Sequence, residues 1–242
     1  MTAVPTSGFS AFGLEPFPEL QPGDDLAGTI SDVLTRTGTE LRDGDIVVVA
    51  SKVVSIAEKR YADLAGITPS PEALGISSRT GKPPEIVQLI LDNSTQHFLA
   101  TERGPIIARH TLGYELTSAG IDRVGTEGAW LLPVDPDASA RALRDALTTY
   151  TGAVIAVVVA DSDGRADRRG ATVISIGAAG VGPLRTTEHG GKRQEETFTD
   201  LIAAAAGLIL GQRGRGAPVA VLRGVSYVPS DEGVAAMLHH RP

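Results

Sequence analysis

Short apolar runs separated by turn residues make up much of the chain. Ile46–Ala50 follows the polar turn at residues 42–45, and a second run covers residues 153–160, between Gly152 and the polar stretch 161–164. Both runs are apolar, rich in β-branched residues and bounded by turn signals, which is typical of buried strands. Together with a third run at residues 217–222, they predict three buried strands.

Helical spacing of apolar residues marks four other segments. In residues 24–34, four apolar residues share one face, and Asp24 or Asp25 precedes them as a candidate N-cap. Residues 85–92 follow a Pro-Pro pair, which suits the first turn of a helix. We expect two more helices, over residues 139–147 and over the Ala-rich stretch 199–210.

The order of these elements lacks the regular strand–helix–strand rhythm of a doubly wound sheet. We therefore predict a mixed α/β (α+β) fold and not a regular Rossmann sheet. Residues 1–13 are expected to form a flexible N-terminal arm, and residues 14–242 a single unit, with two intertwined subdomains as an alternative. Residues 184–196 are polar and charged around a Gly-Gly pair, so we expect a mobile loop there.

The composition narrows the range of partners. The 242 residues carry a net charge of −7 and the sequence pI is about 5.2, so we expect no nucleic-acid or anionic-membrane partner. With no cysteine, any metal must be held by Asp, Glu, His or backbone oxygen, and such ligands favour Mg²⁺ or Mn²⁺. No signal peptide is visible, and the apolar runs are shorter than the about 20 residues that span a bilayer. We therefore expect a cytoplasmic protein.

Three acidic positions follow apolar segments and lie in expected turns: Asp122, Asp161 and Glu195. Carboxylates brought together at strand ends are a common way to hold Mg²⁺ against phosphates. The same pattern also allows that Asp161 caps a turn and that Glu195 is a solvated surface residue. Ser51 and Lys52, directly after the first strand, place a hydroxyl and a cation where a phosphate can bind, although a solvated loop lysine is the more common explanation for Lys52.

Several segments occur together in one known order. They are FPEL with QPGDDL, LRDGDIVVVASKVVSIAEKR, GKPPEIVQLILDNS, SAGID, LLPVDPDASA, ADSDGR, IGAAG and PVAVLRG. Over about residues 14–228 they resemble the coenzyme F(420)-0:L-glutamate (γ-glutamyl) ligase family. The resemblance implies the fold of that family, in its stand-alone form, for the ligase-like unit of residues 14–242.

The resemblance also implies a reaction. In the family, GTP and divalent metals (Mg²⁺ or Mn²⁺) activate a substrate carboxylate as an acyl phosphate, and the amine of glutamate attacks it to form an amide. The family works as a homodimer, so the implied partners are a small-molecule carboxylate, an amino acid, a nucleotide and a second copy of the chain. The implied site residues are Asp122, Asp161, Ser162 and Glu195 for the metals, Phe17, Pro18, Glu19, Leu20, Ser51 and Lys52 for the nucleotide, and Lys52 and Arg165 for catalysis.

The chain also departs from the family pattern. Ile56 stands where the family has a nucleotide-contacting lysine, and AGIDRVG lacks the Ser-Asn pair that follows AGID in the family. After Gly164-Arg165 the usual tryptophan and glutamine are missing. Because the acidic positions are kept while these contacts are lost, we expect a retained metal site with altered substrate or nucleotide selectivity. The alternatives are a catalytically silent relative that binds a nucleotide or a partner, and a phosphate-ester hydrolase.

Overall fold

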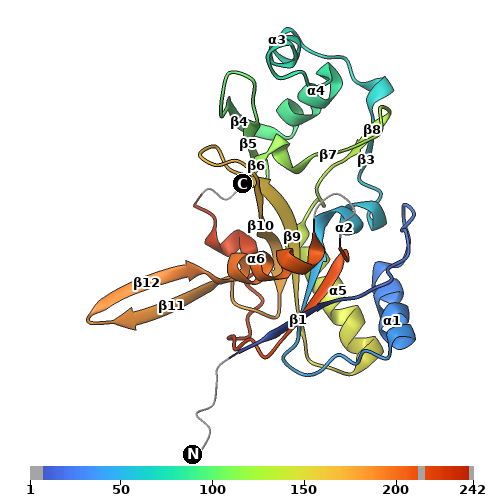
Figure 1. Ribbon diagram of the computed structural model, residues 1–242, viewed down its shortest axis with the longest axis vertical. Coiled ribbons are helices and arrows are strands. Elements are labelled where there is room, and N and C mark those ends of the chain that lie inside the picture. Colours follow the sequence, from blue (N-terminus) through green and yellow to red (C-terminus); the bar gives the residue numbers. More distant parts are fainter. Residues whose placement is uncertain (1–7, 212–215, 240–242) are drawn as a thin grey trace, which may run out of the picture.

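The computed structural model describes residues 8–211 and 216–239. Its main element is a five-stranded sheet in the order β1-β13-β2-β9-β10 (Figure 1). All neighbouring strands are antiparallel except β2 and β9, which are parallel. The strands are β1 (Ser10–Gly13), β13 (Val219–Arg223), β2 (Ile46–Ala50), β9 (Ala156–Gly164) and β10 (Ala171–Ala179).

Helices cover both faces of this sheet, which explains why its central strands are continuously apolar. α1 (Leu26–Thr37) and α5 (Pro136–Thr151) pack together on one face, and α6 (Phe198–Leu210) covers the other (Figure 1). The first four residues of β2 are fully buried between these layers. No helix in the described part of the chain is long and apolar enough to cross a membrane.

The helix boundaries follow local capping. Asp25 is the N-cap of α1 and accepts a hydrogen bond from the Gly28 N–H over 3.0 Å, as the sequence predicts. α5 begins earlier than expected because Asp135 caps it and Pro136 suits its first turn. It ends where Gly152 adopts the left-handed conformation that terminates many helices.

A second, smaller unit is inserted between α2 (Ser51–Ala57) and α5, in the upper part of Figure 1. It has its own apolar core, which includes Val87, Ile90, Ile106 and Ala129. Two three-stranded sheets, two helices and two 3₁₀ turns form it: β3 (Tyr61–Asp63), β8 (Gly128–Trp130) and β7 (Asp122–Val124); β4 (Ser94–Leu99), β5 (Ile106–His110) and β6 (Glu115–Thr117); α3 (Pro71–Thr80) and α4 (Pro84–Asp92); η1 (Leu64–Gly66) and η2 (Ser118–Gly120).

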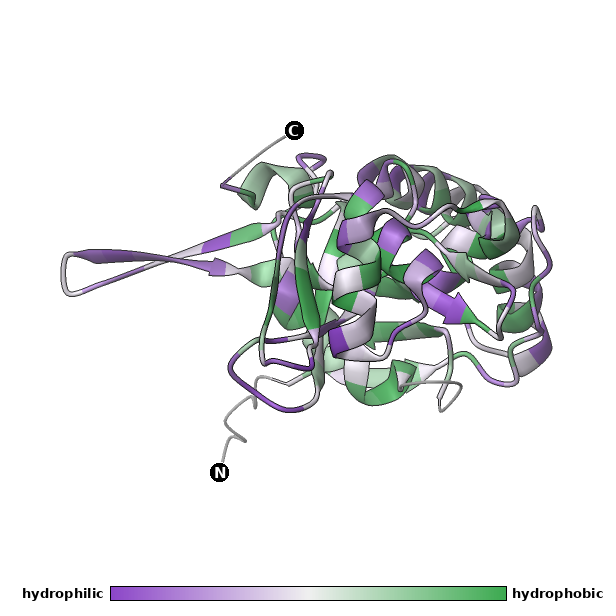
Figure 2. Cartoon of the chain, turned by 90° about the horizontal axis from the view of Figure 1, so that it is seen from above, coloured by the Kyte–Doolittle hydropathy of each residue, from purple (hydrophilic) through white to green (hydrophobic). Residues whose placement is uncertain are grey.

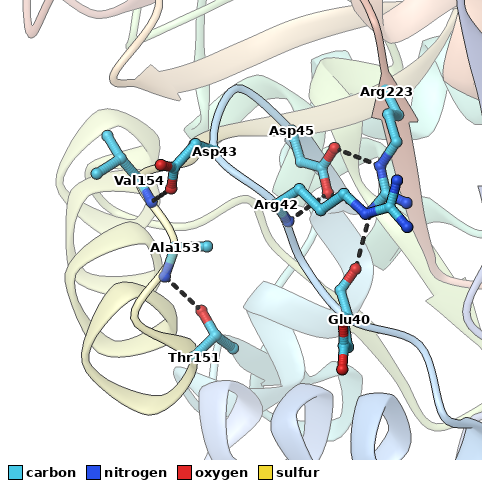
Figure 3. A network of polar contacts seen from close by, with 8 residues as sticks. All are labelled: Glu40, Arg42, Asp43, Asp45, Thr151, Ala153, Val154 and Arg223. Carbon is cyan, nitrogen blue, oxygen red and sulfur yellow. Dashed lines mark hydrogen bonds and ion pairs between the residues drawn. The ribbon is translucent and has the colours of Figure 1, made fainter.

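An ion pair between buried Asp45 and partly buried Arg223 fixes the end of the main sheet opposite the site described below (Figure 3). Asp45, just before β2, is 1% exposed, and its carboxylate accepts hydrogen bonds from Arg223 Nε and Nη2 over 2.8 and 2.6 Å. The Arg42 N–H also donates to Asp45, over 2.9 Å. This bidentate pair joins the start of β2 to the end of β13 and so fixes their register.

Two expectations about the secondary structure are wrong, one about the bounds of a strand and one about a loop. The strand expected over residues 153–160 begins later and continues to Gly164, because Asp161, Ser162 and Asp163 pair with β10 and are kept extended. The loop expected over residues 184–196 is a β-hairpin of β11 (Leu184–His189) and β12 (Lys192–Thr197). Gly190 and Gly191, both with positive φ, form its two-residue turn.

The N-terminal arm also differs from the expectation. Ser10–Gly13, expected to be flexible, forms β1 and pairs with β13 at the edge of the main sheet. Residues 1–7 lie outside the described residues. The last described segment carries a short 3₁₀ turn, η3 (Val234–Met237). Asp137 at the start of α5 accepts hydrogen bonds from the Ala178, Val234 and Ala235 N–H groups, so it joins β10 and η3 to the helix.

Candidate active site

Two parallel strands end side by side in the main sheet. Ala50 of β2 lies opposite Ala160 of β9, so the next residues, Ser51 and Asp161, reach the same edge of the sheet. Ser51 Oγ donates a hydrogen bond to Asp161 Oδ1 over 2.6 Å, although the residues are 110 positions apart. The carboxyl ends of parallel strands are where α/β proteins commonly bind ligands.

Lys52 joins this edge to the second unit. α2 begins at Ser51 directly after β2, and Lys52 Nζ lies 2.8 Å from Asp122 Oδ2. Asp122 is the first residue of β7 and follows the tight turn η2. The two side chains are 50% and 51% exposed, so a ligand can reach both. The site therefore lies where the main sheet and the second unit meet.

The electrostatics of Asp161 favour a bound cation. Burial raises the pKa of Asp161 from its usual value to about 7, hydrogen bonds from Ser51 and from the Ser162 backbone oppose the rise, and the charges of Asp122 and Asp163 add to it. A divalent cation beside these carboxylates would offset their mutual repulsion. The donor atoms are all oxygens, which fits Mg²⁺ or Mn²⁺.

Asp163 is a site residue that sequence reasoning placed in a turn. It is 9% exposed and its Oδ1 accepts a hydrogen bond from the Thr117 N–H over 3.0 Å. Burial raises the pKa of Asp163, and the Thr117 N–H and the Arg165 charge partly offset that rise. Since side chains alternate along a strand, Asp161 and Asp163 share one face of β9. That spacing was visible in the sequence, but its meaning depended on the strand continuing past Ala160.

The side chains of Ser162 and Arg165 do not join the Asp161 carboxylate. Ser162 pairs with Val173, which packs against Gly207 of α6, so its side chain lies on the opposite face of β9 from Asp161. Only its backbone N–H contributes, through the hydrogen bond to Asp161. Arg165 follows the last residue of β9 and is exposed.

Glu195 is not brought to the Asp122–Asp161 pair within one chain. It lies in β12 opposite Thr186, in a hairpin that projects from the body of the molecule (Figure 1), and pairs with Arg193 over 3.0 Å. Figure 2 shows this hairpin as a largely hydrophilic projection. In the residues that the structure describes, no group of three or more His, Cys, Asp or Glu side chains is arranged to hold a metal ion.

The segment from Phe17 to Leu20 connects β1 to α1. Phe17 is partly buried against the main core, Leu20 is buried in it, and Pro18 and Glu19 are exposed. The connection continues to Gly23, whose N–H donates to the Ile56 carbonyl over 3.3 Å, so it lies against α2. Two grooves among the described residues lie elsewhere: one of about 300 Å³ between α1, α2 and α5, and one of about 630 Å³ beside β3 and α4.

Comparison with known proteins identifies the family of the chain. The model of the F(420)-0:gamma-glutamyl ligase family matches residues 16–224. Several proteins named coenzyme F(420):L-glutamate ligase are similar to this chain along most of their length. The protein of Methanothermobacter thermautotrophicus is 38% identical, with 97% of each chain covered. That of Methanosarcina acetivorans is 35% identical over 97% of this chain and 92% of its own, and that of Archaeoglobus fulgidus is 36% identical over 89% and 87%.

The fold and the site define a mixed α/β protein with a carboxylate, hydroxyl and lysine cluster at the ends of two parallel strands. The family match covers most of the chain, and the identities exceed 30% over nearly full length. The chain therefore belongs to the F(420)-0:gamma-glutamyl ligase family, a family of ligases.

Proposed function

We propose that this protein joins L-glutamate, through its amine, to the carboxylate of F(420)-0 or a closely related acid, using GTP and Mg²⁺ or Mn²⁺. The family and the names of the relatives support the ligase reaction and its substrates. The observation that carries the nucleotide and metal part is the cluster at the ends of β2 and β9, where Ser51 contacts Asp161 and Lys52 contacts Asp122. Because GTP is the proposed co-substrate, we place the reaction in the cytoplasm.

The proposed reaction has two steps. First, a carboxylate oxygen of the acid attacks the γ-phosphorus of GTP, the bond to the β-phosphate breaks, and GDP leaves. Second, the amine nitrogen of glutamate attacks the acyl carbon, the bond to phosphate breaks, an amide forms, and the nitrogen loses a proton to solvent. Negative charge is concentrated at the reacting groups in both steps, so the protein contributes mainly by positioning the substrates and neutralising that charge.

Each residue of the cluster has a distinct task in this proposal. Asp122 and Asp161 would hold the divalent cation, which when bound neutralises phosphate charge. Ser51 orients Asp161 by donating a hydrogen bond to its Oδ1. Lys52 is half exposed on a flexible stem, so it can exchange its contact with Asp122 for a phosphate oxygen. Arg165 is exposed near this end of β9 and can approach an anionic substrate.

A homodimer would give Glu195 a role. The hairpin carries Glu195 away from Asp161 of its own chain, and its strands are almost entirely exposed. We propose that the hairpin packs against a partner subunit, where Glu195 would approach the carboxylates of that subunit.

The proposal is tested by incubating the purified protein with F(420)-0, GTP, Mg²⁺ or Mn²⁺ and L-glutamate. We expect GDP, phosphate and a product heavier by one or more glutamyl residues, measured by mass spectrometry. Asp161→Asn should abolish the product, whereas Asp167→Asn, which changes an exposed carboxylate paired with Arg168, should not. GTP binding without turnover for any acid and amine pair would instead identify a silent nucleotide-binding relative. Hydrolysis of phosphate esters without amide formation would identify a hydrolase.

A further inference from the structure

Two hydrogen bonds join the end of β9 to the end of β6. Asp163 Oδ1 accepts from the Thr117 N–H over 3.0 Å, and Thr117 Oγ1 donates to the Gly164 carbonyl over 2.7 Å. Asp163 and Thr117 are 46 positions apart and belong to the main sheet and the second unit, respectively. Neither family resemblance nor local pattern assigns a role to Asp163.

The segment that follows Thr117 has an unfavourable backbone conformation. Ser118, Ala119 and Gly120 have φ values of 56°, 52° and 68°, so three successive residues are left-handed. Only glycine adopts this conformation without a steric cost, and two of the three have side chains. Such a conformation persists only when surrounding contacts impose it. Ala119 is fully buried in the second core, and the bonds to Thr117 hold the start of the turn.

This turn leads directly to the candidate site. Asp122 follows it by two residues and places its carboxylate against Lys52. On the other side, Asp163 lies two residues from Asp161 on the same face of β9. Asp163 thus contacts the segment that carries Asp122, one candidate metal ligand. It also lies close along β9 to Asp161, the other candidate ligand.

We propose that Asp163 is a positioning residue, whose acceptor oxygen holds Thr117, at the start of the left-handed turn 118–120, on β9 and thereby keeps Asp122 next to Asp161 and Lys52. It deepens the proposed function, because it concerns the geometry of the same site. The relevant property is the hydrogen-bond acceptor and not the negative charge. Asparagine at this position keeps an acceptor oxygen of nearly the same geometry, and alanine removes it.

The test compares Asp163→Ala, Asp163→Asn and the matched control Asp167→Ala, whose carboxylate is exposed and forms an ion pair with the neighbouring Arg168. Amide hydrogen exchange of the segment 115–124, measured by mass spectrometry without ligand, reports the turn itself. Calorimetric titration with Mn²⁺ and the separate kcat and KM for GTP report the site. The exchange measurement does not depend on activity, so it remains decisive if the wild-type protein proves inactive.

We expect Asp163→Ala to exchange about tenfold faster in this segment and to bind Mn²⁺ about tenfold more weakly, with a lower kcat. Asp163→Asn should stay within about threefold of the wild type in both measurements, and Asp167→Ala should not differ. Unchanged exchange in Asp163→Ala would overturn the proposal, as would equal damage from Asp163→Asn, because the charge would then be responsible. Faster exchange with unchanged Mn²⁺ affinity in a metal-binding wild type would also overturn it. A wild type that neither binds Mn²⁺ nor turns over would defeat the proposed function alone.

Discussion

Lys52 and Asp122 form an ion pair with both side chains about half exposed. Exposed pairs of this kind contribute little to folding, typically about 0–1 kcal/mol, because water screens them and two side chains lose freedom. In the proposed function, the main contribution of this pair is therefore to ligand binding and not to folding stability. A lysine that is weakly held beside a carboxylate is available to a phosphate group.

The first prediction is that Lys52→Gln separates activity from stability. The free energy of unfolding, measured in urea, should change by less than about 1 kcal/mol. The value of kcat/KM for GTP should fall by about 100-fold or more, because a cation that stabilises transferring phosphate is lost. Arg168→Gln removes another exposed ion pair and is the matched control, with no expected loss of activity. A fully active Lys52→Gln variant would remove Lys52 from the mechanism.

The second prediction concerns His110 at the end of β5. His110 is 7% exposed, and its Nδ1 accepts from the Leu112 N–H over 3.0 Å. Burial, assisted by the charge of Arg60, lowers the pKa of His110 from 6.5 to about 4. The unfolded chain therefore binds this proton more readily than the folded one, and stability is lost as the pH falls from about 6.5 towards 4. The full contribution is about 3 kcal/mol.

His110→Asn should remove this pH dependence. Asparagine offers an acceptor near the position of Nδ1 but does not titrate in this range. We expect the difference in unfolding free energy between the wild type and the variant to change by about 2–3 kcal/mol in favour of the variant between pH 7 and pH 4.5. Urea denaturation across this range measures it. Parallel pH profiles for the two proteins would show that His110 is protonated normally in the folded state.

At the scale of elements, the β11–β12 hairpin and the β9–β10 hairpin differ in how far the rest of the protein packs against them. The strands β11 and β12 form a separate two-stranded sheet and are almost entirely exposed. By contrast, β9 and β10 belong to the main sheet and lie between helices. Gly190 and Gly170, in the two turns, both have positive φ and open space around them. Strain introduced in the two turns should therefore have unequal consequences.

The third prediction compares Gly190→Val with Gly170→Val. A β-branched residue in a left-handed conformation costs about 1–2 kcal/mol. Gly170→Val should lower the free energy of global unfolding by about this amount, because its strands unfold only with the core. Gly190→Val should speed amide exchange in residues 184–197 and change global stability by less than about 1 kcal/mol. A large global loss from Gly190→Val would show that the hairpin is part of the cooperative core.

At the scale of the whole molecule, the site lies between the main sheet and the second unit, which is inserted into the chain that forms the main sheet. The chain leaves the main sheet through α2, builds the second unit, and returns to α5. Arg60 Nε donates to the Leu132 carbonyl over 2.9 Å and so ties the exit to the return. The Lys52–Asp122 and Asp163–Thr117 contacts join the same two units at the site.

The fourth prediction is a homodimer that buries more than about 2,000 Å² in total. The outer face of α6 exposes Leu201 and Leu208, the latter at 89%, and Leu184 at the root of the hairpin is also exposed. A helix with apolar residues on all sides is normally buried, and a second copy would cover this one. Light scattering at micromolar concentration should give twice the chain mass. Leu208→Glu should weaken the dimer, whereas Leu74→Glu, on an exposed position of α3, should not. A monomeric wild type would contradict the prediction.

The sequence by itself determined the elements with strong local signals. Ile46–Ala50 is a buried strand with the expected bounds because a continuous apolar run fits only between two covering layers. The start of α1 at its Asp25 cap was likewise a local matter. The family could also be recognised, since its segments are long and retain their order along the chain. Asp122, Asp161, Ser51 and Lys52 were singled out by their positions after apolar segments and also by the family resemblance.

Only the tertiary structure decided how these residues meet. The Ser51–Asp161 contact joins residues 110 positions apart and depends on the parallel register of β2 and β9, which no local pattern encodes. The extension of β9 through Asp163 depends on its pairing with β10, since the polar residues there have no strand signal of their own. Glu195 was placed in a loop, but its strand forms through pairing across the Gly190-Gly191 turn. Pairing and register arise from contacts between distant residues, so they lie beyond any single window of sequence.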